Sequence, residues 1–444
     1  MKKTKKKLYY GWFVVLAAFL CNFASTGLMI YSFSLFVVPM SNTLDVPRTS
    51  IVLAASIFTI CMGVVSAYVG NQVTKGRIKI LILIGVILLG GGNAILSITD
   101  SLPVFYVCYA FVGIGSAFTG PAVTSTLATA WFDKRRGLAA GIISCGASVC
   151  AIFVPSVLAA IMDSAGIRAA YLANSAIVIV LLLIVMLLVK TKPQDIGLLP
   201  DGLTQAECDA IPAKERPVLV GLTRSQALRT PALWLVCIAF AALGFGQIGV
   251  MQNAAAFLSD LEFSTQTVAS ALGFIGLSGA ISTIICGWLS DRVNPKLVFT
   301  IGNTLLLAAT LILTYTQPDS SYAWLLSYAL LFGFGMGIWA SAVPLIITKL
   351  MGPMYFGAIW GLAFGIRSIF GDTVGVPMIS RIAETAGYQS AFWVAIILFA
   401  LSAGLIIVAP KPKAFIDLET AAGLADHDQA FRPAVGIEKN RILS

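Results

Sequence analysis

The chain has 444 residues, of which 58% are hydrophobic and 11% are charged, and its formal net charge is +9. Soluble domains carry roughly 25% charged residues, so a water-soluble globule could not cover this much apolar surface with so few charges. The composition excludes a soluble enzyme, a disordered chain and a nucleic-acid-binding protein, and it predicts a membrane protein whose main partner is the lipid bilayer.

The eight cysteines include no C-x-x-C pair, and the single histidine, His427, lies near the C-terminus. We therefore expect no zinc site, no disulfide framework and no cofactor. The lysine-rich segment 2–7 resembles the start of a signal peptide, but the apolar stretch behind it, 10–40, is too long for one. We expect a retained first transmembrane helix.

Charged and Pro/Gly-rich breaks leave twelve apolar segments, spans 1 to 12, each reaching the roughly 20 residues that cross a bilayer. They lie near residues 10–38, 49–72, 79–98, 103–131, 136–162, 168–189, 232–258, 266–289, 297–316, 321–348, 354–380 and 387–409. We expect an all-α membrane protein with four parts: an N-terminal six-helix bundle (1–189), a cytoplasmic central loop (190–231), a C-terminal six-helix bundle (232–409) and a cytoplasmic tail (410–444).

Lysine and arginine are distributed unevenly between the connecting segments. With the N-terminus inside, 25 of the 29 basic residues fall in inner segments and three, Arg48, Arg168 and Arg381, in outer loops. This asymmetry predicts that both ends are cytoplasmic, in a cell (inner) membrane. The polar segments are too short to hold a catalytic domain, so we do not expect an enzyme.

The two halves of the chain match at an offset of about 220 residues. The segment that begins at Gly70 matches the one that begins at Gly287, and 137–141 (G-L-A-A-G) matches 357–361 (G-A-I-W-G). Because a six-span repeat starts on the same side each time, we expect parallel repeats related by a pseudo-two-fold axis along the membrane normal. Two such bundles could rock about a site between them, which suits alternating access.

The segment Gly287-Trp-Leu-Ser-Asp291-Arg292-Val-Asn-Pro-Lys296 resembles the G-x-L-x-D-R-x-G-R-K loop between spans 8 and 9 of the major facilitator superfamily. In that family the loop braces the two bundles on the cytoplasmic side. The resemblance therefore implies a cytoplasmic gate made by Gly287, Asp291, Arg292 and Lys296.

A narrower resemblance is to the monocarboxylate transporter and oxalate/formate antiporter branch. It is carried by the segments 9–12, 31–39, 131–141, 195–202, 229–234 and 356–361. The branch implies transport of small carboxylates by proton symport or by exchange. Its members often bind the carboxylate through a span-8 arginine, a position that Thr283 occupies here, and oxalate/formate-type members place a cation in span 11 near the equivalent of Trp360.

Arg367 lies at the midpoint of span 11. A charge at the bilayer centre costs about 2.5–3.5 kcal/mol on insertion scales, so it should face a polar cavity or a partner. Trp360, seven residues earlier, shares its helix face. Because a guanidinium suits a carboxylate, we expect Arg367 to anchor the substrate beside Trp360 and to replace the missing span-8 arginine. The alternative is that it binds helix ends or backbone carbonyls inside the bundle.

Asp372 lies five residues beyond Arg367, about 7.5 Å further along an α-helix. Its side chain would point about 140° away, so we expect no direct pair between the two. An aspartate taken out of water can carry a proton, and Asp372 is the candidate for proton coupling. The alternative is an interfacial aspartate or a helix cap.

The superfamily resemblance also implies that spans 1, 4, 7 and 10 line the cavity, helped by spans 5, 8 and 11. We expect further substrate contacts from polar and aromatic residues on these spans, namely Asn22, Tyr31, Tyr109, Gln247, Asn253, Trp339 and Thr283. The alternative for each polar residue is hydrogen bonding between helices.

These features predict a monomeric secondary active transporter of a small organic anion, a monocarboxylate, that works by alternating access and is coupled to protons or to exchange. Two other functions stay open. One is a facilitator for a neutral or amphipathic small molecule, favoured by the charge-free span 8, and the other is a membrane sensor that transports nothing.

Overall fold

The computed structural model describes residues 9–202 and 220–421. Within these ranges the chain is helical and has no strand. The elements are α1 (Gly11–Asn22), η1 (Phe23–Gly27), α2 (Leu28–Leu44), α3 (Arg48–Thr74), α4 (Ile78–Leu96), α5 (Leu102–Thr119), α6 (Pro121–Trp131), α7 (Arg136–Leu188), η2 (Pro193–Ile196), η3 (Pro200–Gly202), α9 (Arg224–Leu228), α10 (Pro231–Asp260), α11 (Thr265–Ser290), α12 (Pro295–Thr314), α13 (Tyr322–Met351), α14 (Phe356–Ile366), η5 (Arg367–Thr373), α15 (Val374–Ala386), α16 (Tyr388–Val408) and α17 (Lys413–Ala421).

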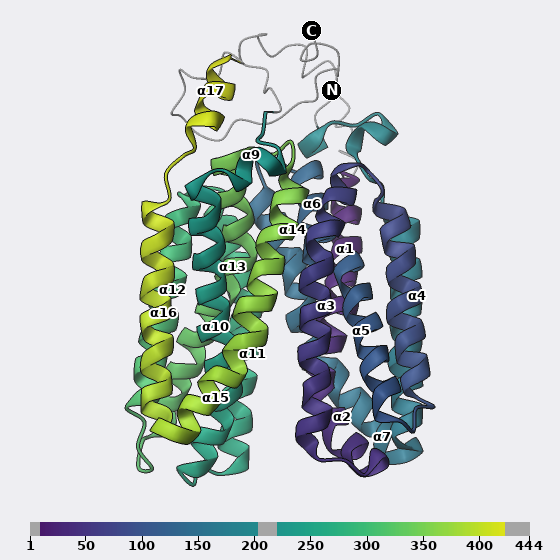
Figure 1. The fold of residues 1–444 in the computed structure, drawn as a ribbon, viewed down its shortest axis with the longest axis vertical. Coiled ribbons are helices and arrows are strands. Elements are labelled where there is room, and N and C mark those ends of the chain that lie inside the picture. The colour runs from purple at the N-terminus through teal and green to yellow at the C-terminus, as the bar shows by residue number, and fades with distance from the viewer. Residues whose placement is uncertain (1–8, 203–219, 422–444) are drawn as a thin grey trace, which may run out of the picture.

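Ten helical stretches in the described part are long and apolar enough to cross a membrane, and α7 is long enough to cross twice. The stretch from α1 through η1 to α2 supplies the first span, so the predicted all-α, twelve-span fold is confirmed. Figure 1 shows two bundles side by side, α1 to α7 in one and α10 to α16 in the other. The helices α9 and α17 lie at the same end of both bundles, which we call the linker end.

Glycine and proline determine where the spans bend. Gly120 is extended, and Pro121 begins α6 because it lacks the N–H that would continue α5. Spans 5 and 6, predicted as separate segments, are joined within α7 by the single non-helical residue Gly166. Its φ of +82° is a conformation that glycine adopts without strain.

The two bundles contact each other closely at the linker end through glycines. An added Cβ at Gly70 of α3 would collide with the carbonyl of Gly357 in α14, and one at Gly287 of α11 would collide with the carbonyl of Gly137 in α7. Gly70 matches Gly287 in the sequence repeat, and Gly137 matches Gly357. The two contacts are therefore equivalent, as a pseudo-two-fold axis between the bundles requires.

The contact between α7 and α11 ends towards the opposite end of the bundles. Gly276 and Gly273 lie on the same face of α11 as Gly287, because they precede it by 11 and 14 residues, about three and four helical turns. An added Cβ at Gly276 or Gly273 would meet no atom within 4 Å. The molecule is thus closed at its linker end.

Candidate substrate site and gate

Arg367 is the first residue of η5, the π-helical turn in the middle of span 11. Its side chain is only 3% exposed. Its Nε lies 3.3 Å from Oδ1 of Asp372, and its Nη2 donates a 2.9 Å hydrogen bond to Oε1 of Gln247 on α10. Gly244, one turn before Gln247, lets α10 approach, since a Cβ there would lie 2.8 Å from Oδ1 of Asp372.

Two aromatic rings flank the Arg367 guanidinium. Its Cζ lies 4.3 Å from the ring centroid of Trp339 on α13 and 4.7 Å from that of Phe240 on α10. Cations are attracted to aromatic faces, more strongly where water is absent. Nη1 of Arg367 has no hydrogen-bond partner among the described residues. The edge of the guanidinium at Nη1 therefore keeps its capacity to donate.

The expectation that Arg367 and Asp372 do not pair is wrong. It assumed an α-helix, in which residues five apart point in different directions. In the π-helical turn of η5 the backbone is wider, and the residues five apart come onto one side. Asp372, with 17% of its side chain exposed, therefore neutralises Arg367 inside the C-terminal bundle.

Trp360 is fully buried and lies at the contact between the bundles. Its Nε1 donates a 3.0 Å hydrogen bond to the carbonyl of Pro121 in α6 of the N-terminal bundle. Its ring stacks on Phe240, with 5.7 Å between centroids, so Phe240 contacts both Trp360 and Arg367. Trp360 thus joins the neighbourhood of Arg367 to the closed linker end.

Of the other residues predicted on the cavity-lining spans, Gln247 and Trp339 are brought to Arg367. Asn253 instead donates to the carbonyl of Gly249 and accepts from Ser380, within its own bundle. The hydroxyl of Thr283 donates to carbonyls of its own helix. Asn253 therefore joins α10 to α15, and the hydroxyl of Thr283 is satisfied within α11.

Two predicted residues of the N-terminal bundle, Asn22 and Tyr109, make contacts within their own bundle. Asn22 donates to Thr124 and to the carbonyl of Ile143. Tyr109 is 6% exposed and packs against aromatic rings of its own bundle. The side chain of Tyr31 lies outside the described residues.

Phe240 was not predicted as a site residue. The sequence does carry a signal for it, because Phe240, Gly244 and Gln247 are spaced by four and three residues and share one face of α10. A buried glutamine in a span marks the polar face of that helix, and its neighbours one and two turns away belong to the same surface.

No group of three His, Cys, Asp or Glu side chains within residues 9–202 and 220–421 is placed to hold a metal ion.

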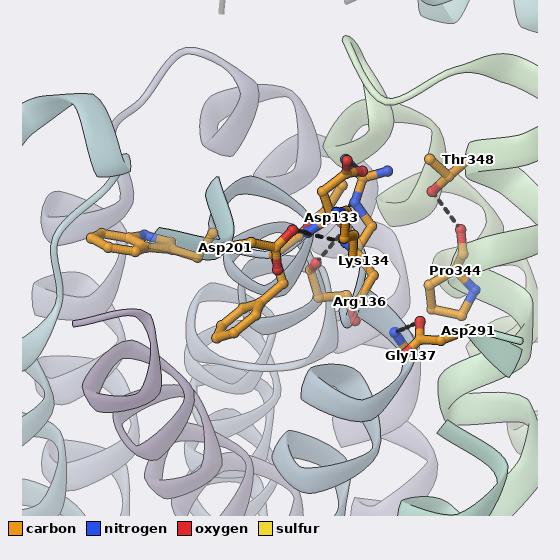
Figure 2. A network of polar contacts seen from close by, with 12 residues as sticks. Asp133, Lys134, Arg136, Gly137, Asp201, Asp291, Pro344 and Thr348 are labelled. Atoms are coloured by element: carbon orange, nitrogen blue, oxygen red, sulfur yellow. Dashed lines mark hydrogen bonds and ion pairs between the residues drawn. The ribbon is translucent and has the colours of Figure 1, made fainter. Parts of the chain in front are cut away.

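The predicted gate residue Asp291 connects the bundles at the linker end (Figure 2). Its carboxylate accepts hydrogen bonds from the backbone N–H groups of Gly137, at 2.6 Å, and Leu138, at 2.9 Å, in the first turn of α7. A carboxylate is stabilised at this end of a helix by the helix dipole. Burial nevertheless raises the pKa of Asp291 to about 6.

The short loop before α7, which contains Asp133 and Lys134, is bound on its other side by the linker. The carboxylate of Asp201 in η3 accepts hydrogen bonds from the N–H groups of Asp133, at 3.1 Å, and Lys134, at 2.9 Å. Between these two contacts lies Arg136, whose Nη2 pairs with Asp133 at 3.0 Å (Figure 2). Asp201 was not predicted, because its contact depends on how the linker folds back onto the bundle.

The other predicted gate residues act inside the C-terminal bundle or at its edge. Gly287 allows the close contact with Gly137. Arg292 lies over the ring of Trp288, with 3.8 Å between its Cζ and the centroid. Lys296 donates to the carbonyl of Ala409 at the end of α16. Lys296 therefore connects the start of α12 to the end of α16, while Asp291 contacts α7 of the N-terminal bundle.

A family model described as the Major Facilitator Superfamily matches residues 15–371. The oxalate:formate antiporter of Oxalobacter formigenes is 22% identical over 389 residues, which cover 86% of this chain and 87% of that protein. The uncharacterized MFS-type transporter YhjX of Escherichia coli (strain K12) is 21% identical over 366 residues, covering 81% of this chain and 86% of that protein. The solved structure of the human organic anion transporter MFSD10 (TETRAN) superposes with a TM-score of 0.66 at 15% identity, over 88% of this chain and 98% of that one. The chain therefore belongs to the Major Facilitator Superfamily, whose members are secondary transporters that work by alternating access.

Proposed function

We propose that the chain transports a small organic anion, a monocarboxylate, and that Arg367 is its anchor. The observation that carries this proposal is the free hydrogen-bonding capacity of a buried cation: Nη1 of Arg367 has no partner in the described part of the chain. A buried donor without a partner is unfavourable, and a carboxylate oxygen would satisfy it with a charge-assisted hydrogen bond.

Gln247 and Trp339 support this role by fixing the guanidinium. The amide of Gln247 holds Nη2, and the ring of Trp339 covers one face of the group. Asp372 pairs with Nε and, among the described residues, leaves Nη1 free. An anion that reaches Nη1 therefore meets an arginine whose orientation is already determined, which reduces the entropy lost on binding.

Asp372 is proposed to couple transport to protons. An incoming carboxylate competes with Asp372 for the same cation, and an aspartate that loses its partner inside the bundle takes up a proton in order to become neutral. Exchange of one anion for another is the alternative form of coupling, because a second anion can also restore the charge balance. A relative with the name oxalate:formate antiporter favours small carboxylates as the substrates.

The test is uptake of radiolabelled formate and oxalate into proteoliposomes. Arg367→Ala should abolish uptake, and Arg367→Lys should weaken it, because an ammonium keeps the charge but loses the planar array of donors. The matched control is Arg381→Ala, which removes an exposed arginine from α15, just beyond the predicted end of span 11. Undiminished uptake by both Arg367 variants would refute the anchor.

A neutral or amphipathic substrate is the second candidate. The observation that favours it is the ion pair itself, since Arg367 and Asp372 together carry no net charge. A substrate with both hydrogen-bond donors and acceptors could then bind without separating the pair. Counterflow measured against a panel of carboxylates and neutral analogues distinguishes the two candidates.

For orientation, we propose that the linker end faces the cytoplasm of a cell (inner) membrane, with both termini on that side. The supporting pattern is the concentration of lysine and arginine in the linker, in the tails and in the loops at that end. The molecule, closed at its linker end, would then be closed to the cytoplasm. Labelling of an introduced cysteine at position 354, compared in intact cells and in inside-out vesicles, tests this orientation.

A further inference from the structure

Span 11 belongs to the C-terminal bundle, and its contact with the N-terminal bundle ends at the π-helical turn η5. Before this turn, the small residues of α14 pack on α3, where a Cβ added at Gly361 would collide with the carbonyl of Ser66 and one at Gly365 with that of Gly63. Close helix contact of this kind requires glycine or another small residue. The turn η5 therefore lies at the end of the contact between α14 and α3.

Three hydroxyl-bearing residues connect the two bundles at this turn. Ser368, fully buried, donates a 2.8 Å hydrogen bond to the carbonyl of Thr59 in α3. The hydroxyls of Thr59 and Thr373 share a second hydrogen bond, also 2.8 Å. We call Thr59, Ser368 and Thr373 the hydroxyl clamp.

The clamp and the ion pair of Arg367 depend on the same backbone geometry. Thr373 donates to the carbonyl of Ser368, five residues earlier, just as Asp372 pairs with Arg367, five residues earlier. In an α-helix, residues five apart lie about 140° apart around the axis. A change of η5 to a regular α-helix would therefore break both pairs at once. One pair contacts α3 of the opposite bundle, and the other lies against α10 of its own bundle.

We propose that the hydroxyl clamp is a positioning device that links occupation of Arg367 to closure of the linker end, with the π-helical turn as the connecting element. The proposal rests on the proposed role of Arg367 as the anchor. An anion bound at Nη1 competes with Asp372 for the charge of Arg367 and so weakens the ion pair that supports the turn. The clamp on its other side then weakens, and α14 can leave α3. Thr59 controls this step without touching the guanidinium.

The experiment measures the distance between the bundles at the linker end, with no substrate added. Spin labels on genetically encoded residues replace Lys75, which follows α3, and Met354, which precedes α14; both side chains are exposed. Pulsed electron paramagnetic resonance then gives the ratio of open to closed forms. Thr59→Val should raise this ratio about fivefold, the effect expected for one lost hydrogen bond, and Thr59→Ser should restore the wild-type value.

A matched control removes a hydroxyl that bonds only within its own helix. Thr310 in α12 is buried and donates to the carbonyl of Leu306, so Thr310→Val should leave the ratio unchanged. Ser368→Ala provides a second clamp variant in case Thr59→Val does not elute as a folded monomer. A wild-type ratio in a folded Thr59→Val or Ser368→Ala protein would overturn the clamp.

The link to the anchor is tested by a double-mutant cycle between Thr59→Val and Asp372→Asn. Because both residues act through one turn, the double variant should change the ratio by clearly less than the product of the two single effects. A product within about twofold of the double-variant value would show independent contacts and would overturn the proposed link. Formate uptake by Arg367→Ala is measured separately, so failure of the anchor can be told from failure of the clamp.

Discussion

Arg367 and Asp372 are five residues apart in the chain and yet form an ion pair, because the backbone between them is a π-helical turn. The two charges compensate each other inside the C-terminal bundle, where an isolated charge would be costly. Any anion that binds Arg367 has to compete with Asp372.

Asp372→Asn should separate binding from proton coupling. The amide keeps the size of the side chain but cannot compete for the guanidinium as an anion, so KM for formate should fall about tenfold. Uptake driven by an acid gradient should be lost, while counterflow continues. The control is Asp163→Asn, an exposed aspartate elsewhere. Gradient-driven uptake at the wild-type level would show that Asp372 carries no proton.

Gln247→Leu should weaken substrate binding with little effect on turnover. The substitution leaves Nη2 of Arg367 without its partner, which costs about 1–3 kcal/mol and frees the guanidinium to reorient. We expect KM to rise about tenfold and kcat to change by less than about twofold. Gln252→Leu, on the same helix but exposed, is the control. An equal loss in both variants would indicate a general effect on α10.

Gly361→Ala should prevent full closure of the linker end. The new methyl group would collide with the carbonyl of Ser66, and backbone cannot move aside as a flexible side chain can. We expect at least about a tenfold loss of uptake and a longer distance between labels at Lys75 and Met354. The same substitution at Gly404, where an added Cβ meets nothing within 4 Å, should have no effect. Wild-type uptake by Gly361→Ala would mean that α3 and α14 need not approach so closely.

Closure of the linker end should depend on pH through Asp291. Burial raises the pKa of this carboxyl from 3.8 to about 6; negative Asp201 adds to the rise, and the N–H groups of Leu138 and Gly137 and the charge of Arg136 oppose it. The closed form therefore binds a proton at Asp291 more readily than an open form with a solvated carboxylate. Its contribution to closure is complete below the lower of the two pKa values and is lost as the pH rises through about 6.

The measurement is the open-to-closed ratio as a function of pH at the linker end. The ratio should rise between about pH 5 and about pH 7 in the wild type, and this dependence should disappear in Asp291→Asn. Asp201→Asn should move the midpoint to lower pH, because it removes a negative charge that raises the pKa of Asp291. A midpoint that stays in place in Asp201→Asn would contradict the electrostatic link between the two residues.

Hydropathy, with charged and Pro/Gly-rich breaks, was enough to predict the spans, because each crossing needs a long apolar segment regardless of its neighbours. The match between Gly70 and Gly287 in the repeat also anticipated equivalent contacts at the linker end. Asp291, which contacts the opposite bundle, was singled out through its motif. These features are local in sequence, or are repeated in it, and so they can be read without coordinates.

The ion pair could not be predicted in the same way. Nothing in the residues 367–373 marks a π-helical turn, since its stability comes partly from Thr59, which is more than 300 residues away. The contacts of Trp360 with Pro121 and of Asp201 with Asp133 likewise depend on how distant segments meet. Sequence periodicity assumes regular helices, and the centre of this transporter is where the helix is irregular.

The reversal of the chain at Gly166 has a mechanical consequence. Spans 5 and 6 are joined there by one non-helical residue, with no flexible loop to absorb relative movement. Span 5 carries the glycines that contact α11, Gly137 and Gly141, so a displacement at that contact is passed directly to span 6. Spans 5 and 6 must consequently move together, and a few glycines inserted beside Gly166 would decouple these two helices.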